Sequence, residues 1–132
     1  MNIQLLHQHF TKIDLTSKLI GEEPIKLEQR FNYEVSYNED FSQCKGVLQL
    51  EIRCAGEPEK LYINTINEGL FSCEGIETES DRRENHVATY SMLFPYSQHM
   101  ISTLAVSSGL PPIILSMEKP STDEVRMQNK NE

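Results

Sequence analysis

The stretch that decides the fold is LFPYSQHMISTLAVSSGLPPIIL, which runs from Leu93 to Leu115. Residues on one face of a helix recur every three or four positions, and five members of the stretch do so: Leu93, Ser97, Ile101, Leu104 and Ser108. Pro95 suits the first helical turn or a kink, because proline has no N–H to donate. Gly109 is a natural residue just past a helix end, and Pro111-Pro112 prevents continuation. The stretch therefore predicts a helix that opens at Leu93–Tyr96 and stops at Gly109.

Upstream of this helix the apolar residues alternate, which is typical of half-buried strands. Residues Phe31–Tyr37 and Leu48–Cys54 both show the two-residue period. The polar segment Ala55–Glu59 is a turn that leads into Lys60–Asn67, and so short a link indicates an antiparallel hairpin. Asn2–Leu15 is a weaker strand whose alternation slips near Leu5-Leu6, as at a β-bulge.

The strand predicted at Lys60–Asn67 carries apolar residues on both faces. A helix could cover one face of this strand and a second subunit the other, so we expect an oligomer. Farther on, Ser121-Thr122-Asp123-Glu124 has the pattern of a capping box and predicts a short second helix. Strands first and helices last give an α+β fold, an antiparallel sheet with helices on one face. We expect one domain over residues 1–132, with a flexible tail from about residue 128.

Composition narrows the classes of partner. The net charge of −8 argues against nucleic acid and against an anionic membrane surface, both of which need basic residues. No run approaches the apolar length of a membrane span, and no signal peptide is recognisable at the start. The three cysteines, Cys44, Cys54 and Cys73, have no metal-ligand or disulfide spacing, and free thiols favour the cytoplasm.

The sequence gives little support for any catalytic or metal-binding group, so we expect no enzyme, no cofactor and no metal. His7 and His9 would share one face of a strand and could hold a metal, but they have no third ligand nearby. The paired acidic residues fall in predicted turns, where solvation is the simpler explanation. The surroundings of Cys73 are apolar and acidic, which raises a thiol pKa.

The remaining candidates for a functional site are apolar and aromatic residues. Tyr33, Val35 and Tyr37 either pack under a helix as core or form the floor of a groove for extended polypeptide, which would use apolar pockets and main-chain hydrogen bonds. So much apolar surface beside the rigid backbone of Leu93–Leu115 favours binding of extended apolar chain over bond breaking.

Three blocks, in order and at similar spacing, resemble segments of the SecB protein-export chaperone family. They are Glu68–Ile76 (EGLFSCEGI), Leu93–Tyr96 (LFPY) and Gly109–Leu115 (GLPPIIL). Phe10-Thr11-Lys12 is similar to the family's first-strand aromatic-Thr-Lys. The resemblance covers nearly the whole chain, with strong identity confined to residues 68–115.

The resemblance implies four antiparallel strands with a long helix and a short C-terminal helix, assembled as a homotetramer that is a dimer of dimers. It implies a chaperone that holds non-native polypeptides, including preproteins, in hydrophobic grooves without ATP. By position, the groove residues would be Tyr33, Val35, Tyr37, Leu110, Ile113 and Leu115. The residues facing a neighbouring subunit would be Leu61, Ile63, Thr65 and Asn67.

A role in protein export is less supported than the holding of non-native polypeptides. The family often has an acidic residue that docks the translocase motor SecA where this chain has Asn64, and no Cys or His follows His99 to form a zinc-binding tail. The alternative is a dedicated partner-binding module, since some SecB-like proteins guard an antitoxin.

Overall fold

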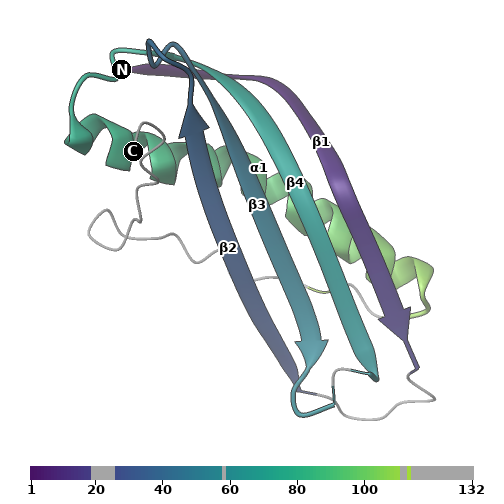
Figure 1. Ribbon diagram of the computed structural model, residues 1–132. Coiled ribbons are helices and arrows are strands. Elements are labelled where there is room, and N and C mark those ends of the chain that lie inside the picture. Colours follow the sequence, from purple (N-terminus) through teal and green to yellow (C-terminus); the bar gives the residue numbers. More distant parts are fainter. Residues whose placement is uncertain (19–25, 58, 111–112, 114–132) are drawn as a thin grey trace.

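A four-stranded antiparallel sheet with one long helix across a single face makes up the described structure (Figure 1). The computed structural model describes residues 1–18, 26–57, 59–110 and 113. The elements are β1 (Asn2–Ser17), β2 (Leu27–Tyr37), β3 (Gln43–Cys54), β4 (Leu61–Glu74) and α1 (Glu79–Ser107). The α+β architecture expected from the sequence is confirmed. Within these residues no helix is long and apolar enough to cross a membrane.

The strands lie in the order β1-β4-β3-β2, so β1 and β2 are the two edges. The predicted Ala55–Glu59 turn joins β3 to β4, which pair antiparallel as expected for a hairpin. The register of β1 against β4 shifts between Leu5 and His7, which confirms the bulge predicted at Leu5-Leu6. It shifts again between Phe10 and Lys12, a second bulge that the sequence pattern did not reveal.

Alternation divides the sheet into a helix face and an outer face. On β4, Leu61, Ile63 and Phe71 are fully buried on the helix face, while Tyr62 and Ile66 on the outer face are half-buried. The strand at Lys60–Asn67 therefore does carry apolar residues on both of its faces, as the sequence predicted. Its helix-side residues belong to the core of this same chain.

The helix α1 begins fourteen residues before the predicted start, at Glu79 instead of Leu93. Thr78 caps it: its hydroxyl accepts from the Asp81 N–H at 3.0 Å, and the Asp81 carboxylate accepts from the Thr78 N–H at 3.0 Å. This reciprocal capping box satisfies two N–H groups that a helix start leaves without partners. The prediction was wrong because the first turns of α1 carry polar residues, so apolar periodicity becomes visible only near Leu93.

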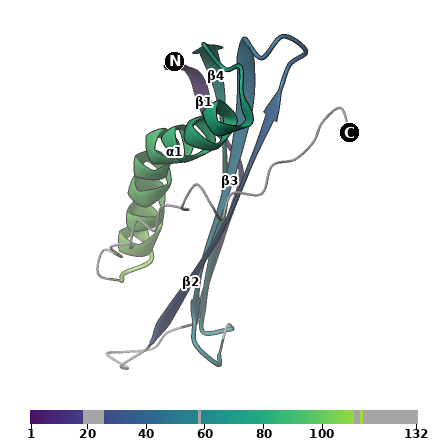
Figure 2. The ribbon, with the colours of Figure 1, turned by 90° about the vertical axis from the view of Figure 1, so that its left-hand side faces the viewer.

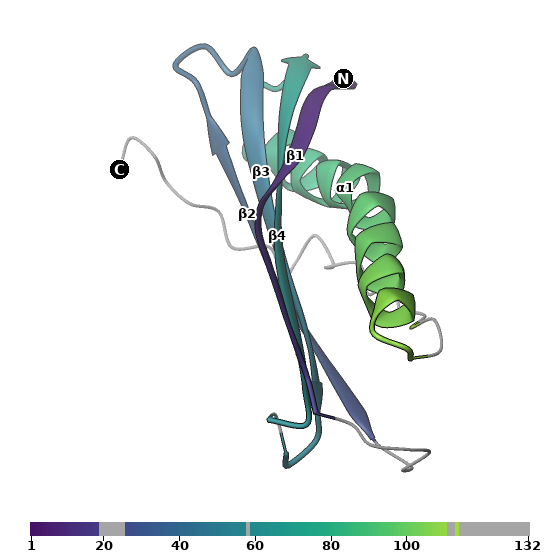
Figure 3. The same cartoon turned by 90° about the vertical axis from the view of Figure 1, so that its right-hand side faces the viewer.

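Pro95 therefore lies inside α1 and marks a kink, the second of its two predicted roles. Its ring removes the N–H that would bond the carbonyl of Ser91, which bends a helix. Figures 2 and 3 show the bend part-way along α1.

The predicted helix stop is confirmed. Gly109 adopts φ +82°, a conformation that glycine takes without strain. The Gly109 N–H bonds the Val106 carbonyl at 3.0 Å and the Leu110 N–H bonds the Ala105 carbonyl at 2.9 Å. These two bonds form a Schellman motif that closes the end of α1.

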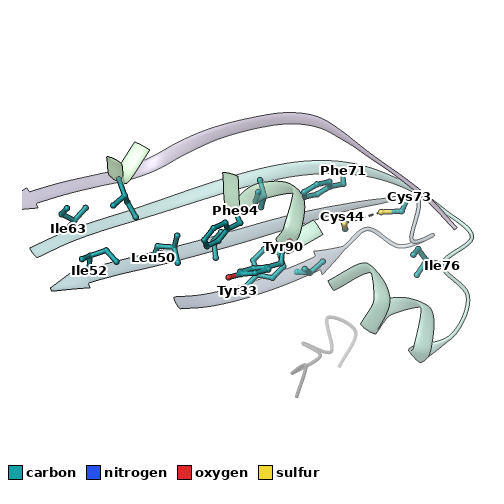
Figure 4. Close-up of a cluster of buried hydrophobic side chains, with 14 of the residues drawn as sticks. Tyr33, Cys44, Leu50, Ile52, Ile63, Phe71, Cys73, Ile76, Tyr90 and Phe94 are labelled. Atoms are coloured by element: carbon teal, nitrogen blue, oxygen red, sulfur yellow. Dashed lines mark hydrogen bonds between the residues drawn. The ribbon is translucent and has the colours of Figure 1, made fainter. Parts of the chain in front are cut away.

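The core lies between the helix face of the sheet and α1, and it extends along the helix as far as Ile101 and Ala105 (Figure 4). Tyr90 packs against Phe31, Tyr33 and Phe94, with ring centroids 5.3, 5.6 and 5.9 Å away. Gly46 and Gly69 are cross-strand partners. Because neither has a side chain, Tyr33 can pack against the backbone of Gly46 and Leu93 against that of Gly69. A Cβ on Gly69 would lie 2.6 Å from Leu93 Cδ2, and one on Gly46 would overlap the Tyr33 hydroxyl.

Some predictions fall outside the described residues. They are the short helix at Ser121–Glu124, the tail from about residue 128 and the groove residue Leu115.

Candidate functional site

The side chains of Tyr33 and Val35 are buried beneath α1, with 8% and 4% of their surface exposed. The Tyr33 hydroxyl donates to Thr89 Oγ1 at 2.5 Å, and its ring meets the edge of His86 at 4.9 Å. Burial raises the pKa of Tyr33, and the hydrogen bond to Thr89 opposes that rise. These side chains are core in this arrangement and do not face an open groove. Their assignment to client binding stays a prediction.

Tyr37 is half-buried at the end of β2 and belongs to a small aromatic cluster. Its hydroxyl accepts from Asn85 Nδ2 at 2.8 Å, and burial raises its pKa to about 12. Its ring lies 5.2 Å from that of Phe41, over which the Arg82 guanidinium sits at 5.5 Å, a cation–π distance. The sequence reasoning missed Phe41, although an aromatic residue in the polar segment Asn38–Lys45 was a usable signal.

An open pocket of about 270 Å³ adjoins this cluster. Its lining residues come from the facing ends of β2 and β3 and from β4: Ser36, Tyr37, Asn38, Gln43, Cys44, Lys45 and Leu70. Phe41, which contacts Tyr37 but does not line the pocket, has φ +59°, a left-handed backbone that bulky residues rarely adopt. Such strain is most often retained at binding sites and switches.

Leu110 and Ile113 pack as half-buried residues against the core. Two side chains of α1 hold this segment, because Gln98 Nε2 and Ser102 Oγ both donate to the Ile113 carbonyl at 2.8 Å. The structure thus places these two predicted groove residues just past the end of α1. No described contact joins them to Tyr37.

The predicted interface residues Leu61, Ile63, Thr65 and Asn67 are all buried on the helix face. Asn67 donates from Nδ2 to the Leu93 carbonyl and to Ser97 Oγ, both at 3.2 Å, and accepts from Gln8 Nε2 at 2.6 Å. Asn67 therefore links β1, β4 and α1 within one chain. A second subunit would meet the opposite face of this strand, so the interface role stays a prediction.

The cysteines are buried and free. The Sγ atoms of Cys44 and Cys73 are 3.4 Å apart, and Asn85 Nδ2 donates to Cys44 at 3.5 Å. Burial raises the pKa of the Cys73 thiol to about 12, in the direction expected from the sequence. A thiol so rarely ionised is a poor nucleophile.

The histidines are divided between surface and core. His7 and His9 share the outer face of β1 as predicted, with ring centroids 5.1 Å apart. Within the described ranges no set of three His, Cys, Asp or Glu side chains is grouped closely enough for a metal. His86 is buried at the sheet, and burial lowers its pKa.

The outward face of α1 has an unusual composition. From Asn85 to its end at Ser107 the helix contains no Asp, Glu, Lys or Arg, in a chain whose net charge is −8. Tyr96 and Val106 on this side are 45% and 54% exposed. Depletion of charge with exposed aromatic and aliphatic groups is typical of the centre of a protein interface.

Comparison with known proteins identifies the fold. No family model matches the chain, and no curated protein matches it by sequence. It is similar to the solved structure of the SecB-like chaperone Rv1957 of Mycobacterium tuberculosis, in complex with a ChAD peptide from the Rv1956 HigA1 antitoxin. The TM-score is 0.69 at 15% sequence identity, over 89% of this chain and 88% of that one. The SecB-like fold expected from the sequence is therefore confirmed.

A second solved structure, a protein of unknown function from Streptococcus agalactiae, is also similar. Its TM-score is 0.59 at 11% identity, over 89% of this chain and 98% of that one.

Proposed function

We propose that this protein is a non-enzymatic chaperone that holds non-native polypeptide without ATP. The observation that carries the proposal is its likeness in fold to a SecB-like chaperone solved with a bound peptide. The half-buried aromatic residues Tyr37 and Phe41 supply apolar surface for such a client, and Tyr37 also lines an open pocket. The three free cysteines support a reducing, cytoplasmic location.

A dedicated antitoxin-type partner is the second candidate. It is favoured by the antitoxin peptide in the similar structure and by Asn64, which stands where the export family often has the acid for SecA. Asn64 is 3% exposed on the outer face, and its Oδ1 accepts from Gln49 Nε2 at 3.0 Å. Holding preproteins for export through SecA is accordingly the less supported form of the proposal.

We also propose that the chain assembles, as a dimer of dimers, through surfaces that include the uncharged outward face of α1. Exposed Tyr96 and Val106 on that face would be covered in the assembly. Light scattering at micromolar concentration should give an oligomer, and Tyr96→Glu should shift it toward smaller species. A wild-type monomer would contradict this part of the proposal.

Suppression of aggregation tests the chaperone function. A chemically unfolded client diluted into buffer without ATP should stay soluble when the purified protein is present at equimolar ratio. Phe41→Ser should reduce the protection, since it removes apolar surface and the ring contact with Tyr37, which lines the pocket. Leu6→Ser is the matched control, because Leu6 is a 47% exposed apolar residue at the opposite edge of the sheet.

Absence of protection by the wild-type protein at any ratio would refute the general chaperone. Co-purification then separates the two candidates. A broad set of bound proteins favours the general chaperone, and one dominant protein favours the dedicated partner.

A further inference from the structure

Two histidines on the outer face of β1 take no part in the site described above. His7 and His9 are both exposed, and their ring centroids lie 5.1 Å apart. Gln8 between them points to the helix face, where its Nε2 donates to Asn67 Oδ1 at 2.6 Å. Because side chains alternate along a strand, this buried bond keeps both imidazoles on the same side of the sheet.

The spacing of the two rings is that of imidazoles bound to one metal ion. A tetrahedral zinc ion binds histidine nitrogens at about 2.1 Å, and the ring centroid lies roughly 1 Å behind the nitrogen, so two such rings have centroids about 5 Å apart. The 5.1 Å between the rings of His7 and His9 matches this value. Both side chains are exposed, so each ring can rotate to aim one nitrogen at a common point.

The register of the sheet supplies a carboxylate that the sequence near the histidines lacks. Glu68 of β4 is the cross-strand partner of His9, so both side chains project from the outer face. Glu68 Oε1 lies 3.8 Å from Nζ of Lys45, whose side chain is 55% exposed. An ion pair so exposed contributes little to stability, and it is a weak competitor for a divalent cation.

The donor atoms select the class of metal. Imidazole together with a carboxylate suits Zn²⁺, Cu²⁺ and Ni²⁺, whereas Mg²⁺ and Ca²⁺ prefer oxygen donors throughout. The net charge of −8 favours the approach of any cation. An exposed set of three donors leaves a coordination position to water, so the bound ion would be exchangeable.

We propose that His7 and His9 form a binding site for a divalent transition-metal ion of the zinc type, with Glu68 as the third ligand. The two histidines lie in the run His7–Phe10, between the two bulges of β1. A bound ion would therefore fasten β1 to β4 where the edge strand is interrupted on both sides. This inference is independent of the chaperone function.

Isothermal titration calorimetry of the full chain with ZnCl₂, in a buffer that does not bind metal, tests the site. One Zn²⁺ should bind per chain, and MgCl₂ should give no binding. His7→Gln and His9→Gln should each weaken Zn²⁺ binding at least about tenfold, because the advantage of two linked ligands is lost. His99→Gln is the matched control: His99 is also exposed, on α1, and its loss should leave the affinity unchanged.

A second pair of variants tests the carboxylate. Glu68→Gln should weaken Zn²⁺ binding severalfold, because the amide is a poorer ligand for this ion than the carboxylate. Glu34→Gln removes the same charge from the same face, two strands away on β2, and should bind as the wild type does. Equal affinity of the two variants would remove Glu68 from the ligand set.

Thermal unfolding gives a readout that does not depend on calorimetry, since a ligand of the folded state raises the unfolding midpoint. Saturating Zn²⁺ should raise the midpoint of the wild type and of His99→Gln, but not that of His7→Gln or His9→Gln. A wild-type protein that binds no Zn²⁺ would overturn the inference. So would binding that persists undiminished in both His7→Gln and His9→Gln.

Discussion

Replacing Asn67 by alanine removes three hydrogen bonds that join β1, β4 and α1. Asn67 is fully buried, bonding the Leu93 carbonyl, Ser97 Oγ and Gln8 Nε2. A hydrogen bond contributes about 0.5–1.5 kcal/mol net, so three contribute about 1.5–4.5 kcal/mol. The Leu93 carbonyl keeps its helical partner, and half-buried Gln8 can turn toward water. We therefore expect the free energy of unfolding to fall by about 2–3 kcal/mol.

Urea unfolding followed by circular dichroism measures this change. It should be done at two protein concentrations, because the stability of an oligomer depends on concentration. Asn32→Ala is the control: Asn32 is exposed on the outer face of β2, and its loss should change stability by less than about 0.5 kcal/mol.

The competing role for Asn67, contact with a neighbouring subunit, predicts a different result. Loss of less than about 1 kcal/mol together with dissociation of the oligomer in light scattering would refute the intrachain account.

Three further predictions concern other parts of the core. Gly46→Ala should lower the free energy of unfolding by about 1–3 kcal/mol, because the new Cβ overlaps the buried Tyr33 hydroxyl; an unchanged urea midpoint would contradict this. Burial lowers the pKa of His86, so below its ordinary pKa of 6.5 the unfolded chain binds a proton that the folded chain excludes. Stability should therefore fall as pH drops through 6.5, and His86→Gln should flatten that slope. With its pKa raised to about 12, Cys73 should react with iodoacetamide at pH 8 only after unfolding; rapid alkylation of the native protein, seen by mass spectrometry, would show that it is accessible.

The strands could be predicted from sequence because each has one buried face. Alternation in Phe31–Tyr37 and Leu48–Cys54 follows directly from burial on the helix side, and the slip at Leu5-Leu6 marks a real bulge. The stop of α1 could be predicted because Gly109 is needed for its backbone conformation.

The start of α1 could not be predicted from apolar periodicity. Its first turns bury polar groups, Asn85, His86 and Thr89, whose hydrogen bonds become visible only in three dimensions. Thr89 Oγ1, for example, accepts from Tyr33 and donates to the Asn85 carbonyl at 2.8 Å. Sequence patterns record which residues are apolar, not which polar residues find buried partners.

The candidate site was only partly predictable for a related reason. Alternation marked Tyr33, Val35 and Tyr37 as one face but did not separate the buried Tyr33 and Val35 from the half-buried Tyr37. That distinction depends on where α1 lies over the sheet, which alternation does not record. No residue type signals it.

Amide hydrogen exchange of the protein with and without an unfolded client tests the central claim most directly. The account predicts that amides near Tyr37 and the open pocket that it lines become protected when a client is bound. Amides of β1, at the opposite edge of the sheet, should change little. Protection confined to β1, or no change near Tyr37, would contradict the account.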